Sequence, residues 1–128
     1  MINDQPTKIT TEGDRVWRNA DGELHRDNGP AVEHADGDRL WYRHGKYHRK
    51  DGPAVERANG AKEWWVNGLL HRQDGPAIEY ANGDKIWCKN GETHRADGPA
   101  VENADGTVEY WINDKRVDQP KESVLHKL

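Results

Sequence analysis

Apolar and polar residues alternate along this chain in a pattern that recurs at a fixed interval. Each short stretch in which apolar residues mix with polar ones, such as 31–35, is followed by an Asp-Gly or Asn-Gly pair and then by a second stretch that contains an aromatic residue. The segment HRDNGPAVE begins at His25, and similar segments begin at His48, His71 and His94, so successive copies are 23 residues apart. A fixed period of this size indicates a repeat array, in which each unit buries its apolar face against its neighbours.

Two turn signals in each copy predict strands on either side of them. Asp-Gly and Asn-Gly favour two-residue hairpin loops because both central residues of a type I′ turn have positive φ. The turn at Asp36-Gly37 separates predicted strands at 31–35 and 38–43, and the turn at His44-Gly45 sends the chain back. We therefore predict an all-β fold, an elongated antiparallel meander of stacked β-hairpins.

Two-residue loops at both turns predict the register of the strands. Val32 lies opposite Trp41, and Trp41 lies opposite His48, so Val, Trp and His share one structural face. On this face we expect the His to stack on the Trp or to bond a backbone carbonyl. The residues that vary between copies, including Tyr42 opposite Tyr47, then lie on the other face.

The repeated Arg has two candidate partners in each copy. In the second copy, for example, Arg49 can pair with Glu56 or with Asp51. Exposed pairs of this kind contribute only about 0–1 kcal/mol each, so we expect them to fix register rather than to stabilise strongly. The first copy departs from the pattern because Asn28 replaces the Asp.

Boundaries follow from where the repeat begins and ends. We expect a flexible segment at 1–8, an array at 9–117 that starts with a partial copy, and a capping segment at 118–128. The stretch KESVLHKL in the last segment is compatible with a short helix.

Composition narrows the function classes. The chain has 128 residues, of which 33% are charged, with a net charge of −4 and no basic stripe, so we expect no nucleic-acid partner. The single Cys88 cannot form an internal disulfide and is best explained as a small buried hydrophobe. No apolar run is long enough to span a membrane. We therefore expect a cytoplasmic protein, in the host cell if the source is viral.

Catalytic and metal motifs are missing from the sequence. No nucleophile elbow, phosphate loop, CxxC or HExxH pattern occurs. The repeated His and Glu recur in every copy, whereas a catalytic constellation occurs once, so we interpret them as structural. We predict no enzyme activity, no catalytic residues, no metal site and no cofactor.

The repeat NGxxHRxDGPAxExxNGxxxW, present from Gly13 to Asn113, resembles the MORN repeat. It is most similar to the variant MORN repeats of bacterial antitoxin or immunity-type proteins and of phage and large-virus proteins. The resemblance implies an elongated β-hairpin platform that binds other molecules.

We thus predict a non-enzymatic protein-binding module that inhibits its partner by occlusion, as an antitoxin, an immunity factor or a phage counter-defence protein. An aromatic strip would contact the partner, with acidic residues beside it facing a basic rim. The strip consists of Tyr42, Tyr47, Trp65, Leu70 and Trp111, and the acidic residues are Glu63 and Glu109. One alternative is a nucleotide-binding protein that uses Arg43, Arg49 or Arg72 for phosphates. Another is a self-assembling structural protein such as a homodimer.

Overall fold

The computed structural model describes residues 4–119, which form strands and no helix. The strands are β1 (Lys8–Ile9), β2 (Arg15–Val16), β3 (Val32–Glu33), β4 (Arg39–Leu40), β5 (Tyr42–Arg43), β6 (Lys46–Tyr47), β7 (Val55–Glu56), β8 (Lys62–Glu63), β9 (Trp65–Val66), β10 (Leu69–Leu70), β11 (Ile78–Glu79), β12 (Lys85–Ile86), β13 (Cys88–Lys89), β14 (Glu92–Thr93), β15 (Val101–Glu102), β16 (Val108–Ile112) and β17 (Lys115–Val117).

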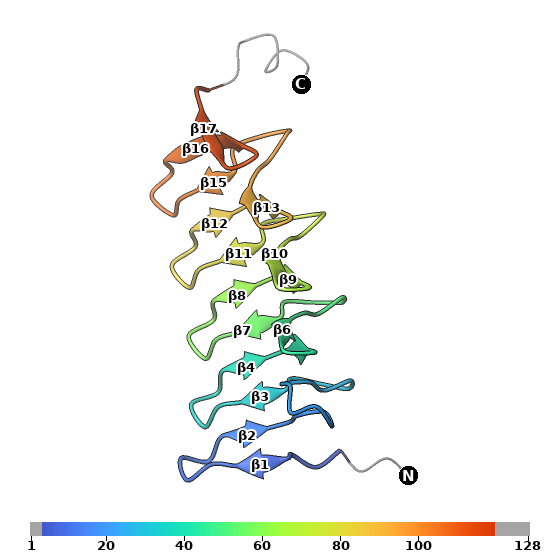
Figure 1. Ribbon diagram of the computed structural model, residues 1–128. Coiled ribbons are helices and arrows are strands. Elements are labelled where there is room, and N and C mark those ends of the chain that lie inside the picture. The colour runs from blue at the N-terminus through green and yellow to red at the C-terminus, as the bar shows by residue number, and fades with distance from the viewer. Residues whose placement is uncertain (1–3, 120–128) are drawn as a thin grey trace.

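The strands form one long sheet with small hairpins beside it. The sheet has 11 strands in the order β1-β2-β3-β4-β7-β8-β11-β12-β15-β16-β17, and every pair is antiparallel. Three separate two-stranded hairpins, β5-β6, β9-β10 and β13-β14, lie along its side (Figure 1). The predicted all-β meander of successive hairpins is confirmed, and the sheet is not closed into a barrel.

The two turns of each unit differ in length. At the second turn His44 and Gly45 have φ of 49° and 78°, and Tyr42 pairs with Tyr47, as expected for a two-residue type I′ loop. At the first turn the His34 N–H donates to Asp38 O at 2.9 Å and the Gly37 N–H donates to His34 O at 2.9 Å. Only Gly37 has positive φ there, at 105°, so this loop has three residues and ends in a left-handed residue.

The longer loop shifts the register, and our prediction of two equal turns was wrong at this point. Val32 pairs with Leu40 and Glu33 with Arg39, so Val32 does not lie opposite Trp41. Because neighbouring residues of a strand point to opposite faces, Val32, Leu40 and Tyr42 share one face of the sheet. Trp41 falls on the other face, which we call the outer face.

The core lies on the face that carries Val32. Val32, Leu40 and Val55 are buried, and Leu24, Tyr42, Tyr47 and Trp65 pack against them. The Ala that directly precedes β3, β7, β11 and β15 is fully buried as well, at positions 31, 54, 77 and 100. Cys88 is buried, and this burial raises the pKa of its thiol to about 11.

On the outer face, residues of opposite charge alternate from strand to strand. Each member of the row is the Cα partner of the next across the sheet. The row runs Arg15, Glu33, Arg39, Glu56, Lys62, Glu79, Lys85 and Glu102. Opposite charges in directly facing positions favour this register over a slipped one.

Residues before the array make specific contacts, although we expected mobility there. The Thr7 N–H donates to Val16 O at 2.8 Å, as the Ala31 N–H donates to Leu40 O at 2.8 Å in the next unit. The segment 7–9, TKI, therefore occupies the positions that 31–33, AVE, occupies in the next unit. The predicted helix-compatible stretch at 121–128 lies outside the described residues.

Candidate functional site

The repeated Trp and Arg of each unit form a stack on the outer face. The guanidinium carbon lies 3.8 to 4.0 Å from the centroid of the Trp ring in all four units. The pairs are Arg26 on Trp17, Arg49 on Trp41, Arg72 on Trp64 and Arg95 on Trp87. A cation over an aromatic face is attracted by the ring quadrupole, by about 0.5–1 kcal/mol where the site is exposed.

Each guanidinium is also held by oxygen atoms of its own unit. Nη1 of Arg49 donates to Pro53 O at 3.0 Å and to Glu56 Oε2 at 3.1 Å, and Nε lies 3.3 Å from Asp51 Oδ1. Both predicted carboxylate partners of the Arg are therefore confirmed. The stack on Trp was not predicted, because the assumed register placed His rather than Arg against the Trp.

The repeated His links one unit to the next. Nδ1 of His48 accepts a hydrogen bond of 3.0 Å from the backbone N–H of Asn67, which is the first residue of the following type I′ turn. His71 and His94 make the same bond to Asn90 and Asn113. The expected contact with a backbone carbonyl was wrong, since the ring nitrogen accepts from a backbone donor.

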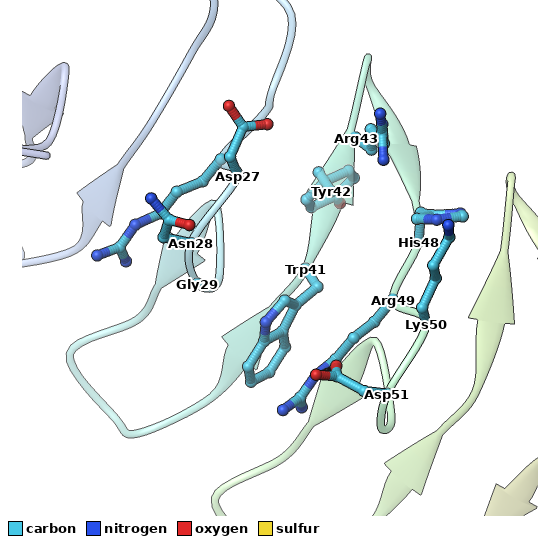
Figure 2. Close-up of a pocket in the computed structure, with 11 residues that line it drawn as sticks. Asp27, Asn28, Gly29, Trp41, Tyr42, Arg43, His48, Arg49, Lys50 and Asp51 are labelled. Atoms are coloured by element: carbon cyan, nitrogen blue, oxygen red, sulfur yellow. Dashed lines mark hydrogen bonds and ion pairs between the residues drawn. The ribbon is translucent and has the colours of Figure 1, made fainter. Parts of the chain in front are cut away.

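Open grooves separate the stacks of consecutive units. The first has a volume of about 570 Å³ and lies between the loop 26–29 and the loop 48–51. Figure 2 shows Asp27 and Asn28 on one side of this groove, Arg49 and Asp51 on the other, and Trp41 between them. Two further grooves, of about 830 and 840 Å³, repeat the arrangement around Trp64 and Trp87.

More cations than carboxylates line each groove, although every Arg of a stack is also paired with a Glu of its own unit. Four cations and two carboxylates line the first groove, and three cations and two carboxylates line each of the others. Arg43, Arg49 and Arg72, the residues considered for phosphate binding, all line these grooves. The face of each Trp ring beneath the guanidinium is not open to a nucleobase.

The predicted aromatic strip runs along the hairpins on the face that carries the core. Tyr42 and Tyr47 stack with centroids 4.5 Å apart, and Tyr47 lies 5.1 Å from Trp65, which is paired with Leu70. These side chains are half-buried. Burial and a hydrogen bond with Tyr47 raise the pKa of the Tyr42 hydroxyl. We predicted that the strip and the Val row lie on opposite faces of the sheet. This was wrong, because Tyr42, Tyr47 and Trp65 pack against the buried cluster that contains Val32 and Val55.

Both acidic residues expected beside the strip contact its Trp side chains. Trp65 Nε1 donates to Glu63 Oε1 at 2.8 Å, and Trp111 Nε1 donates to Glu109 Oε1 at 2.9 Å. The pair occurs in every second unit, since Leu40 and Ile86 occupy the Glu position in the units between. Each carboxylate thus supports its neighbouring indole.

The gap before Trp17 is closed by the chain itself. Trp17 Nε1 donates to the backbone O of Asp4 at 3.0 Å, and the Asp4 carboxylate accepts from Arg26 Nε and Nη2 at distances from 2.7 to 3.2 Å. The hydrogen bonds from Arg26 lower the pKa of Asp4. Sequence reasoning missed this contact. Two features of the sequence could have indicated it. Asn28 stands where the other copies have Asp, so Arg26 lacks that carboxylate, and Pro6 precedes β1 as the repeated proline precedes a strand in the other copies.

A scan against models of protein families and a search of curated proteins both found no match to the chain. Within residues 4–119 no three His, Cys, Asp or Glu side chains form a group that could hold a metal ion. No helix of that part of the chain has the length and apolar character needed to cross a membrane.

Proposed function

We propose that this chain is a non-enzymatic protein-binding module that inhibits its partner by occlusion, as an antitoxin, an immunity factor or a phage counter-defence protein. The observation that carries the proposal is the continuous half-exposed strip of Tyr42, Tyr47 and Trp65 along an open, elongated array. Aromatic residues on a pre-formed surface are typical of interface hot spots, because little side-chain freedom is lost on binding.

The way each unit uses its polar side chains supports a scaffold rather than an enzyme. The repeated His accepts from a backbone N–H, and the repeated Arg is held by a carbonyl and carboxylates. The Asp residues at three of the unit junctions accept from backbone N–H groups, as Asp38 does from Ala58 at 2.7 Å. The similarity of the repeat to MORN repeats supports the same reading.

The test is affinity capture with the tagged chain from a lysate of its natural host, followed by reconstitution with the purified candidate. Trp111→Ala is the informative variant, because Trp111 belongs to the strip but lies outside the buried cluster. Lys85→Ala, on the outer face, is the matched control. We expect one partner that binds the wild type and the control but is lost with Trp111→Ala, and whose activity falls when the chain binds.

Trp65→Ala is less informative, since Trp65 packs against the core and its loss would reduce stability as well as contact area. Thermal unfolding of every variant therefore accompanies the capture. A partner that binds Trp111→Ala as tightly as the wild type would contradict the assignment of the strip. A reconstituted partner that keeps its full activity would contradict inhibition.

A further inference from the structure

The contacts of Asp4 show what the Trp and Arg of a stack bind when the gap beside them is filled. One residue supplies both acceptors, its backbone carbonyl to Trp17 Nε1 at 3.0 Å and its carboxylate to Arg26 Nη2 at 2.7 Å. The occupant is a short extended segment, Asp4-Gln5-Pro6, that leads into β1. The first gap is thus a filled example of an arrangement that recurs three more times.

In the three open grooves the same donors have no partner. Among residues 4–119, Nε1 of Trp41, Trp64 and Trp87 has no hydrogen-bond acceptor, and neither has Nη2 of Arg49, Arg72 and Arg95. No side-chain nitrogen among those residues is both buried and unsatisfied, so these indole N–H groups can be reached. Asp51, whose side chain is 89% exposed, contacts Arg49 only at Nε. Nη2 of Arg49 is therefore left for another acceptor.

We propose that each of the three grooves binds an acidic residue of an extended partner polypeptide, in the manner of Asp4. The carboxylate accepts from Arg Nη2, and the backbone carbonyl of the same residue accepts from Trp Nε1. The Arg Nη2 atoms that have no acceptor in these grooves favour such an anion, because a bond between a guanidinium and a carboxylate is charge-assisted. The site lies on the outer face, so it does not depend on the aromatic strip.

The spacing of the grooves specifies the sequence of the ligand. Two strands of the long sheet separate consecutive stacks, which at about 4.8 Å per strand gives about 10 Å. A polyproline II segment rises about 3.1 Å per residue and has three residues per turn, so every third residue returns to the same side after about 9 Å. Acidic residues three apart, with proline between them, in a segment that crosses the strands therefore match the array.

The test uses the six Trp indole N–H signals of the ¹⁵N-labelled full chain, which contains six Trp. The probe is a blocked peptide of repeated Asp-Gln-Pro units, and the control peptide has Asn in place of Asp. We expect the signals of Trp41, Trp64 and Trp87 to shift on titration. The signals of Trp17, Trp65 and Trp111 should stay in place, because Asp4, Glu63 and Glu109 already accept from them. The Asn peptide should bind about tenfold more weakly, since a carboxylate strengthens the bond to Arg.

In the Asp4→Ala variant we expect the Asp peptide to bind at a fourth site, the gap beside Trp17. A folding defect would not produce an additional binding site. Removing the carboxylate weakens the hold on Asp4, and the Trp17 signal should then respond to the Asp peptide with the other three. Equal binding of the Asn peptide would overturn the proposal, as would shifts confined to Trp65 and Trp111. Stronger shifts at Trp41, Trp64 and Trp87 with inorganic phosphate or ATP than with the peptide would overturn the polypeptide ligand and favour a phosphate.

These outcomes are distinguishable from failure of the proposed function. Loss of partner capture by Trp111→Ala concerns the strip, whereas the three indole signals report on the grooves alone. A Trp64→Phe variant keeps a ring beneath Arg72 but removes the indole donor. It should bind the Asp peptide more weakly than the wild type, as measured from the shifts of the Trp41 and Trp87 signals.

Discussion

The guanidinium carbon of Arg49 lies 3.9 Å from the centroid of the Trp41 ring, and the opposite side of the guanidinium faces Gly52. A Cβ atom added at Gly52 would lie 2.9 Å from the Arg49 Cζ, closer than such contacts occur in proteins. The glycine of the DGPA segment is therefore explained by the space that the guanidinium needs. Its backbone does not require positive φ, unlike that of Gly37.

Gly52→Ala should destabilise the chain by about 1–2 kcal/mol. The new methyl group displaces Arg49 from Trp41 and weakens its bonds to Pro53 O and Glu56, and interactions of these types contribute about 0.5–1.5 kcal/mol each. Urea unfolding followed by Trp fluorescence measures the change. In an Arg49→Ala background the same substitution should have little effect, because no guanidinium remains to be displaced. An equal loss of stability in both backgrounds would show that the glycine is required for another reason.

Asp4 supplies Arg26 with the carboxylate that Asn28 lacks, and a compensating substitution can test this. The other copies have Asp at the position of Asn28, and there it contacts the Arg of its own unit, whereas Arg26 takes its carboxylate from Asp4. Asp4→Ala should therefore destabilise the first unit, and adding Asn28→Asp should recover part of the loss. In the wild-type background Asn28→Asp should not stabilise, because two carboxylates would then compete for one guanidinium. Thermal unfolding of the four proteins decides this, and a stabilising Asn28→Asp single variant would contradict it.

Much of the fold could be predicted from the sequence because the 23-residue period and the turn residues both act locally. The prediction of a type I′ turn at His44-Gly45 was correct, since two adjacent residues with positive φ leave few alternatives. The prediction of a two-residue loop at the first turn was wrong, because Asp36-Gly37 is also compatible with a three-residue loop in which only Gly37 is left-handed. One residue of difference moves every side chain of the strand to the other face.

A signal for the correct register was present in the sequence. The three-residue loop brings Glu33 opposite Arg39 and Val32 opposite Leu40, whereas the two-residue loop brings Glu33 opposite Leu40. Pairing charge with opposite charge in successive units was the better criterion. The Trp and Arg stacks could not be derived without that register, and the contact of Asp4 with Arg26 joins residues that are 22 positions apart.

One of the links between units is missing, and restoring it should stabilise the array. Asp14, Asp38 and Asp84 each accept a 2.7 Å hydrogen bond from the backbone N–H of an Ala in the next unit. Ala61 occupies the same position of its unit, opposite the backbone N–H of Ala81.

Ala61→Asp should therefore raise the unfolding free energy by about 0.5–1.5 kcal/mol, the usual net contribution of a hydrogen bond. Asp38→Ala is the reverse experiment and should lower the unfolding free energy, because the Ala58 N–H loses its acceptor. Urea unfolding of both variants measures the two changes. If Ala61→Asp left the unfolding free energy unchanged while Asp38→Ala lowered it, the junction at Ala61 would not be equivalent to the junction at Asp38.

Stability should fall on mild acidification because of the hydrogen bond between His48 and Asn67. Nδ1 of His48 is an acceptor in this bond, so a proton on that nitrogen breaks it. Burial, and then the charges of Arg43 and Lys50, lower the pKa of His48 below its usual 6.5. Since the unfolded chain then binds the proton more readily, the stabilisation is complete above about pH 6.5 and is lost as the pH falls through the lowered pKa.

His48→Asn separates this effect from the titration of other groups. The Asn Oδ1 can replace Nδ1 as acceptor for the Asn67 N–H but does not titrate. Unfolding free energies measured from about pH 8 to about pH 5 should decline more steeply for the wild type than for this variant. Asp4, Asp14 and Asp38 also have lowered pKa values, but because these are carboxylates their contribution is lost only below about pH 4. Identical profiles for the two proteins above about pH 5 would show that His48 does not couple the junction to pH.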